Sequence, residues 1–216
     1  MNIIARLIFI FFVFTHFALA NESKVFDFTN LEFSQLEVRK VRGADNKTIY
    51  KIGSNEKGNF LKAVADNAAS GLGKEIKIDL NKTPFINITW KVEKDLPNIR
   101  ENTKKGHDFA ARVFVIKKTG ATPLSNRAIN YVFSSNQNVG ISSPSPYTKK
   151  SIDKVLANSK NSFNQWITVK ANVKEDFKKF HDLDVNTLDA VAIMSDTDNS
   201  KMTAIAYYQN IYFSAE

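Results

Sequence analysis

The sequence predicts an all-β protein, an antiparallel, jelly-roll-like β-sandwich with one short connecting helix. Apolar residues recur mostly with a period of two, which is typical of strands that bury one face. These alternating segments are separated by connections rich in Gly, Asn, Ser or Pro. The length of 216 residues, with 43% hydrophobic and 24% charged residues, favours a single globular domain.

The clearest pair of strands lies between residues 75 and 92. The segment Glu-Ile-Lys-Ile-Asp-Leu at 75–80 alternates strictly, so its apolar residues face a core and its charged residues face solvent. A turn at 81–84 leads to a strand over 86–92, in which Trp90 lies on the apolar face. Further strands are expected at 48–52, 60–65, 108–117, 128–134, 164–171, 188–195 and 203–213, which gives about nine in all.

The one expected helix begins at Asn172. Asn172 followed by Glu175 is an N-terminal capping pattern, and the helix is expected to end near 181–182 and to pack on a sheet. The stretch at 140–148 contains two prolines, so it is predicted to be a long surface loop.

Residues 1–20 have the pattern of a signal peptide of the bacterial Sec type. Arg6 precedes an apolar run at 7–14, and Ala18-Leu19-Ala20 forms a small-x-small cleavage pattern. A retained N-terminal anchor is the alternative, although the apolar run is short for a membrane span. The sequence has no cysteine, so an exported chain fits a bacterial periplasm or exterior. We therefore expect one β-sandwich domain over 21–216.

The charge and the missing motifs exclude several classes of function. The formal net charge is +8, or +7 without Arg6, and most of the lysines are scattered singly or in pairs. This pattern is that of a solvated surface or of a polyanion-binding patch. Nucleic acid is not an expected partner, because no recognition helix, zinc module or RNA-binding signature occurs. Nucleophile-elbow, zinc-protease, phosphate-loop and dinucleotide motifs are also absent.

Five blocks of sequence resemble a known family. The chain contains, in this order, Ala-Ala-Ser-Gly-Leu at 68–72, His-Asp-Phe-Ala-Ala-Arg-Val at 107–113, Asn-Tyr-Val-Phe at 130–133, Asp-Thr-Asp-Asn at 196–199 and Ala-Tyr-Tyr-Gln-Asn-Ile-Tyr-Phe at 206–213. Together they resemble the exported bacterial family known as domain of unknown function 3047, over nearly all of 25–213. The chain departs from the family pattern at His107-Asp108, where an acidic pair is expected, and at Phe133, where Trp is expected. The resemblance implies no biochemical activity.

A second resemblance concerns the fold. A strand with Ser-Gly-Leu, a strand ending Ile-Asp-Leu, a turn and a strand with Trp90 are similar to carbohydrate-binding jelly rolls. The last strand of such modules often contains apolar–Asp–Asn–Ile–apolar, and Gln209-Asn210-Ile211-Tyr212 is the equivalent here. A shared sandwich does not by itself imply a shared function.

Arg112 is the first candidate for a functional residue. It lies in the middle of a predicted strand, where an unpaired guanidinium would be costly to bury. Alternation places Asp108 on the same face, about 13 Å away along the strand, which is too far for a direct pair. Arg112 therefore needs the carboxylate of a neighbouring strand, such as Asp196 or Asp198, or a ligand carboxylate, such as that of a uronic acid.

The segment Asp196-Thr197-Asp198-Asn199 follows the most apolar strand. Its side chains either build a tight turn or supply oxygen ligands to calcium. No cofactor other than calcium is suggested by the sequence.

The aromatic residues divide according to strand alternation. Trp90 is expected in the core, whereas Trp166 shares a face with Thr168 and Lys170. There an exposed indole would be free to stack on a sugar ring or a partner; the alternative is that the helix beginning near residue 173 covers it. Tyr131, Tyr147 and Tyr207 are candidates for lining a groove. The predicted ligand-binding residues are Arg112, Asn130, Tyr131, Asp108, Trp166 and Tyr207, and the predicted metal ligands are Asp196, Asp198 and Asn199.

These features favour an exported envelope protein that binds a glycan or cell-envelope polymer without catalysis. One alternative is a polysaccharide lyase or glycoside hydrolase acting on an acidic polysaccharide, which would use overlapping residues. Another is a structural envelope-assembly protein without a small ligand. This last hypothesis predicts that Arg112 is fully paired within the protein.

Overall fold

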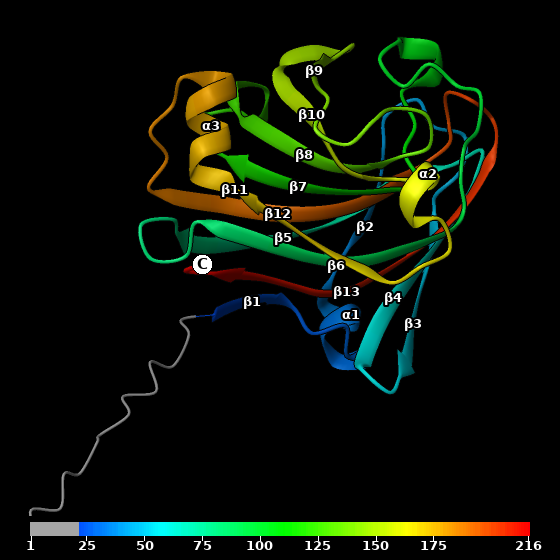
Figure 1. Ribbon diagram of the computed structural model, residues 1–216, viewed down its shortest axis with the longest axis horizontal. Helices are drawn as coiled ribbons and strands as arrows, with labels where there is room; N and C mark the ends of the chain where they lie inside the picture. Colours follow the sequence, from blue (N-terminus) through cyan, green and yellow to red (C-terminus); the bar gives the residue numbers. More distant parts are fainter. Residues whose placement is uncertain (1–21) are drawn as a thin grey trace, which may run out of the picture.

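The protein is a sandwich of two β-sheets that pack face to face (Figure 1). The computed structural model describes residues 22–216, so the predicted signal peptide lies outside the described residues. The six-stranded sheet contains β1 (Glu22–Phe26), β3 (Ile49–Asn55), β4 (Gly58–Asp66), β6 (Phe85–Lys94), β11 (Ile167–Asn172) and β13 (Thr203–Ser214). The seven-stranded sheet contains β2 (Val38–Lys40), β5 (Ala69–Asp79), β7 (Ala111–Lys117), β8 (Arg127–Ser134), β9 (Ser142–Ser145), β10 (Thr148–Asn158) and β12 (Thr187–Asp196).

The strand order determines which strands form the outer face of each sheet. The six-stranded sheet runs β11-β6-β13-β4-β3 with β1 beside β13, and the seven-stranded sheet runs β2-β5-β12-β7-β8-β10-β9. All pairs are antiparallel except β10 with β8, which is parallel. The predicted β-sandwich is confirmed, with this parallel pair as its one departure from an antiparallel arrangement among the described strands.

All the predicted strands are present, and four further strands were missed. The missed strands are β1, β2, β9 and β10. β9 falls within the stretch expected to be a loop, and its Pro144 is tolerated because β9 is an edge strand. β10 was not predicted from the sequence because it buries polar residues, Asp153 and Asn158, as well as apolar ones.

The predicted helix is confirmed as α3 (Val173–His181). The side chain of Asn172 accepts a hydrogen bond from the backbone N–H of Glu175 at 3.1 Å, and Phe177 is buried in the core. The expectation of a single helix was wrong, because short helices α1 (Asn30–Gln35) and α2 (Ser159–Ser162) and 3-10 turns η1 (Lys104–Gly106) and η2 (Pro123–Ser125) also occur. No helix among residues 22–216 is long and apolar enough to cross a membrane.

The core lies between the sheets and follows the predicted alternation. Trp90 is fully buried there, as expected, and its ring meets that of Phe133 edge to face. On β7, Ala111, Val113 and Val115 point into the core. Arg112 therefore points to the opposite, outer face of the seven-stranded sheet.

Candidate functional site

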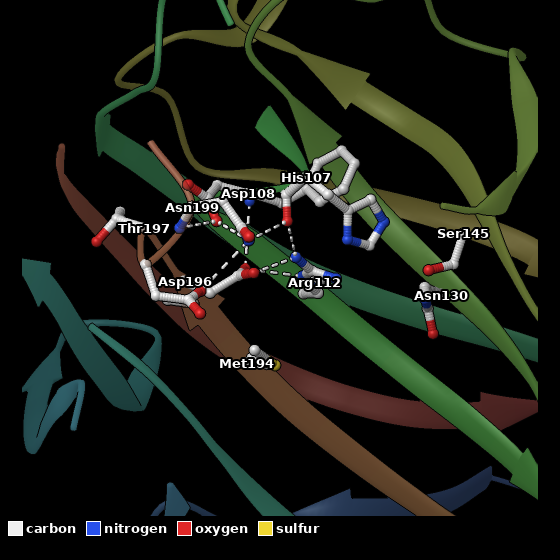
Figure 2. A network of polar contacts seen from close by, with 12 residues as sticks. His107, Asp108, Arg112, Asn130, Ser145, Met194, Asp196, Thr197 and Asn199 are labelled. Atoms are coloured by element: carbon white, nitrogen blue, oxygen red, sulfur yellow. Dashed lines mark hydrogen bonds and ion pairs between the residues drawn. The ribbon is translucent and has the colours of Figure 1, made fainter. Parts of the chain in front are cut away.

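Arg112 forms a buried ion pair with Asp196 at the end of β12. The guanidinium Nε donates to Oδ1 of Asp196 at 2.8 Å, and Nη2 donates to Oδ2 (Figure 2). Both side chains are less than 5% exposed. The sequence predicted either a carboxylate of a neighbouring strand or a ligand as the partner of Arg112. The structure shows the carboxylate, which belongs to Asp196.

Asp108 lies in the loop before β7 and not on the strand. The expected strand at 108–117 begins at Ala111, so the predicted separation of Asp108 and Arg112 along one strand face was wrong. The Asp108 carboxylate is fully buried and accepts hydrogen bonds from the backbone N–H groups of Asn199 and Ser200 and from the Asn199 side chain. Asp108 thereby fixes the turn after β12.

Asp108, Asp196 and Asp198 bring three carboxylates together. One oxygen from each lies within 4.8 Å of the other two. Burial raises the pKa of Asp196 to about 7; the positive charge of Arg112 opposes this shift, and the charges of Asp108 and Asp198 add to it. Burial and the charge of Asp108 also raise the pKa of Asp198.

These carboxylates are the donors that a calcium ion prefers, but most of their oxygens are already engaged. Arg112 binds both oxygens of Asp196, and N–H groups bind both oxygens of Asp108. Asn199 uses its amide nitrogen on Asp108, and its amide oxygen accepts a hydrogen bond from the Tyr147 hydroxyl. The calcium site at Asp196, Asp198 and Asn199 stays a prediction.

An open cleft of about 320 Å³ lies beside this cluster on the outer face of the seven-stranded sheet. Four segments form it, namely the β2–β3 connection, the loop before β7, the β9–β10 turn and the end of β12. The lining residues are Val41, Arg42, His107, Arg112, Tyr147, Met194, Asp196, Asp198 and Asn199. Tyr147 is 55% exposed, and its hydroxyl oxygen lies 3.1 Å from the backbone carbonyl oxygen of Lys104.

A second polar network lies next to the cleft. His107 Nε2 is 2.7 Å from Oδ2 of Asp153, and the Asn130 side-chain amide donates to Oδ1 of Asp153 at 2.7 Å. Figure 2 shows the His107 ring directed toward Asn130 and Ser145. Sequence reasoning missed Asp153 because β10 was not predicted. The sequence does place the Asp153 carboxylate between two apolar residues, Ile152 and Val155, which are buried, and this position was the available indication of a buried carboxylate.

Tyr131 does not belong to this site. As the strand neighbour of Asn130 it points to the other side of β8, where it is fully buried in the core. Its hydroxyl donates to Oδ2 of Asp176 on α3 at 2.9 Å. The prediction that Tyr131 contacts a ligand together with Asn130 was wrong, because adjacent residues of a strand face opposite ways.

Trp166 and Tyr207 lie on the opposite outer face of the sandwich. Tyr207 is on β13 and Trp166 directly precedes β11, both in the six-stranded sheet. Their rings meet edge to face with centroids 5.9 Å apart. The predicted ligand-binding residues therefore fall on two separate faces and not in one groove.

Comparison with known proteins identifies the family. Residues 34–212 match the family model described as protein of unknown function (DUF3047). The chain belongs to the DUF3047 family. In this DUF3047 protein, two of the sequence blocks that carried the resemblance, 107–113 and 196–199, meet at the cleft and contribute the Arg112–Asp196 pair.

Solved structures similar to this DUF3047 chain include one binding module and two enzymes. The family 30 carbohydrate-binding module of the cellulosomal cellulase Cel9D-Cel44B of Clostridium thermocellum is 8% identical, covers 84% of this chain and 91% of its own, and has a TM-score of 0.47. A cellulase derived from Cel12A of Rhodothermus marinus is 9% identical, covers 90% of this chain and 99% of its own, and has a TM-score of 0.41. Endoglucanase 3 of Trichoderma harzianum, from family GH12, is 8% identical, covers 91% of this chain and 97% of its own, and has a TM-score of 0.41. No curated protein matches the chain.

Proposed function

We propose that this protein is an exported envelope protein of bacteria that binds a glycan without catalysis, in the cleft beside Arg112 and Asp196. The observation that carries the proposal is the lining of the cleft. An aromatic ring, Tyr147, stands at its edge, and hydrogen-bonding groups of both kinds surround it. A sugar ring offers apolar C–H faces and many hydroxyls, so it needs this mixture of partners.

The polar groups of the cleft supply both donors and acceptors. Arg42 is exposed and contributes guanidinium N–H donors, while Asp198 contributes carboxylate oxygens. An aromatic side chain with a few converging polar groups is a common composition of ligand sites, and a carbohydrate uses both kinds of group. The residues are thus matched to the hydroxyls of a carbohydrate.

The aromatic edge of the cleft is held in place before any ligand arrives. The Tyr147 hydroxyl is fixed by Asn199, and Asn199 is fixed by Asp108. The Tyr147 ring also meets the His107 ring edge to face, with centroids 5.6 Å apart. A fixed ring loses little conformational freedom on binding, which favours affinity.

The same geometry argues against hydrolysis. A glycoside hydrolase needs two carboxyl groups that flank the scissile bond, about 5 to 9.5 Å apart. Of the three clustered carboxylates, Asp108 and Asp196 are buried and hydrogen-bonded, so only Asp198 is available to a ligand. One accessible carboxylate is suited to binding but not to a two-carboxylate mechanism.

A lyase mechanism also lacks its parts. Such a mechanism needs a tyrosine or histidine base. Tyr131 is in the core, and Nε2 of His107 is engaged by Asp153. Burial and the nearby carboxylates raise the pKa of Tyr147, so this tyrosine is protonated near neutral pH. Noncatalytic binding is therefore the function that these residues support best.

A structural role in envelope assembly is the second candidate. One specific observation favours it, because Arg112 is paired within the protein as that hypothesis predicts. The two candidates differ in what they require of the exposed cleft residues, Arg42 and Tyr147. Glycan binding depends on both side chains, whereas an assembly protein without a small ligand does not.

The test is a thermal-shift screen of the purified protein against neutral and acidic polysaccharides. A ligand that binds only the folded state stabilises it by about 2.7 kcal/mol at a hundred times its dissociation constant. We expect a shift with at least one polysaccharide, and its loss in Tyr147→Ala and Arg42→Ala. Leu124→Ala, at an exposed residue outside the cleft lining, is the control that keeps the shift. No shift with any polysaccharide would favour the assembly role.

A further inference from the structure

Three aromatic side chains form a cluster on the outer face of the six-stranded sheet. Phe60 comes from β4, Tyr207 from β13, and Trp166 from the residue before β11. The ring centroids are 5.5 Å apart for Phe60 and Tyr207, 5.9 Å for Trp166 and Tyr207, and 6.0 Å for Phe60 and Trp166. All three are partly exposed, so this aromatic cluster is in contact with solvent.

The backbone beneath the cluster is shaped to let Phe60 lie across the sheet. Gly53 on β3 pairs with Phe60, and a Cβ atom at Gly53 would lie 2.5 Å from Cζ of Phe60. The absence of a side chain at Gly53 therefore allows the ring to extend over the neighbouring strand. The aromatic cluster spans from β3 to β11 as a result.

Charged side chains hold the middle ring of the cluster. The ammonium groups of Lys62 and Lys91 lie 5.3 and 5.0 Å from the centroid of the Tyr207 ring. The Tyr207 hydroxyl donates to Oε2 of Glu93 at 2.8 Å. Tyr207 is thus fixed between its neighbours, and the faces of Phe60 and Trp166 are left to contact other molecules.

A polar hollow of about 410 Å³ adjoins the aromatic cluster. Its lining is Glu22, Lys24, Thr89, Thr168, Asn210 and Tyr212. Thr168 lies two residues after Trp166 on the same face of β11, and its hydroxyl is 2.8 Å from that of Thr89 on β6. Aromatic faces and a row of hydroxyl and amide groups therefore lie side by side on one sheet.

We propose that this outer face is a second carbohydrate-binding surface, which takes a chain of acidic sugars. One sugar ring contacts Trp166 and Phe60 through its C–H face, and its neighbour in the chain places its hydroxyls in the polar hollow. Two of the lysines beside the surface are paired, Lys24 with Asp27 and Lys91 with Glu93. Lys62, its cross-strand neighbour Lys51 on β3, and Lys170 on β11 lie on the same face and form no ion pair among the described residues, whereas Glu22 is the one acidic group left unpaired there. This excess of positive charge favours carboxylated sugars over neutral ones.

The surface is independent of the cleft. The two lie on the outer faces of opposite sheets, with the core between them. The inference shares with the proposed function only the class of ligand. Two sites on opposite faces would allow one protein to hold two chains of a polymer network.

The test is affinity electrophoresis of the whole protein in gels that contain polygalacturonate, with hydroxyethylcellulose as the neutral comparison. We expect polygalacturonate to retard the protein, and retardation to weaken with salt. Trp166→Ala and Phe60→Ala should each weaken binding roughly tenfold, and Trp166→Phe should restore most of it. Phe163→Ala is the matched control, since Phe163 is 43% exposed on the same connection but makes no ring contact with the aromatic cluster.

Fluorescence quenching gives a readout that requires no substitution. The two tryptophans differ in access, because Trp90 is fully buried and Trp166 is partly exposed. Iodide should therefore quench mainly Trp166, and polygalacturonate should protect it. Unchanged quenching in the presence of bound polysaccharide would overturn the inference, as would a complete lack of retardation.

The outcomes separate the two sites. Loss of retardation in Tyr147→Ala with none in Trp166→Ala would overturn the second surface and leave the cleft intact. Loss in Trp166→Ala alone would support the second surface and count against the cleft. Loss of part of the affinity in each variant would support both sites.

Discussion

The guanidinium of Arg112 and the carboxylate of Asp196 are joined by two hydrogen bonds at the point where β7 meets the end of β12. The pair is buried, and the Arg112 guanidinium also lies 4.7 Å from the centroid of the Phe109 ring. Removal of one partner would leave an uncompensated charge in a site with little water. This pair therefore ties the end of β12, where the turn beside the cleft begins, to β7.

Replacement of Arg112 by Ala is expected to lower the free energy of unfolding by about 3–5 kcal/mol, because Asp196 is then buried without its partner. Arg112→Lys is expected to recover little, since an ammonium group does not reproduce the two-pronged contact. Urea denaturation measures both. The double variant Arg112→Met with Asp196→Leu is the control and should cost less than the single change. A loss below about 1 kcal/mol in Arg112→Ala would contradict the importance of the pair.

Asp198→Asn is expected to change how stability depends on pH. Burial and Asp108 raise the folded-state pKa of Asp198 above 3.8, so ionisation of Asp198 is disfavoured in the folded protein. Its contribution to stability is therefore greatest at low pH and is lost as pH rises through the raised pKa. Asparagine does not ionise and avoids this loss. The variant should gain stability relative to the original protein as pH rises from about 4 through the raised pKa of Asp198.

The gain should be modest, because Asp198 is partly exposed and solvent screens its charge. Thermal unfolding followed by circular dichroism across this pH range measures it. Asp45→Asn is the matched control, since the pKa of Asp45 is lowered by its hydrogen bond to Lys201 and its effect has the opposite sign. A difference that is constant with pH would contradict the prediction.

Local alternation was sufficient to predict most of this fold. The strands at 75–80 and 86–92 bury one face each, and the structure has them as β5 and β6. β10 was missed because Asp153 is buried by contacts with His107 and Asn130, which lie on other segments. A polar residue that long-range partners bury interrupts the local apolar alternation from which a strand is predicted.

The site was predicted in part for a similar reason. The cost of burying Arg112 indicated a carboxylate partner, and Asp196 was one of the two named. The grouping of Trp166 with Arg112 failed, because which sheet a strand joins depends on pairing between distant segments. Tyr131 is different, since its alternation with Asn130 already placed the two on opposite faces.

Tyr131→Phe is expected to lower the free energy of unfolding by about 1.5–3 kcal/mol, because a buried hydrogen bond to the Asp176 carboxylate is lost. The carboxylate keeps its contact with Lys154 at 2.7 Å, so the fold is expected to persist. Tyr147→Phe, at an exposed site, should change stability by less than about 0.5 kcal/mol. If Tyr131→Phe instead weakened glycan binding at unchanged stability, its placement in the core would be contradicted.

Calcium removal is expected to leave the folding of the protein unchanged. A calcium ion needs about six to eight oxygen ligands, whereas Arg112 and backbone N–H groups engage the oxygens of Asp196 and Asp108. The positive charge of Arg112, buried against the cluster, also opposes a divalent cation. The melting temperature in excess calcium should therefore equal that in EDTA.

The decisive comparison for calcium uses Asp198, because it is the most accessible carboxylate of the three. A bound ion would raise the melting temperature in calcium, and Asp198→Asn would abolish that rise. Such a result would contradict the prediction, and isothermal titration calorimetry would then give the stoichiometry of the ion. With no ion bound, Asp198→Asn has the same melting temperature in calcium and in EDTA, and the cluster is held by Arg112 together with the N–H groups that bind Asp108.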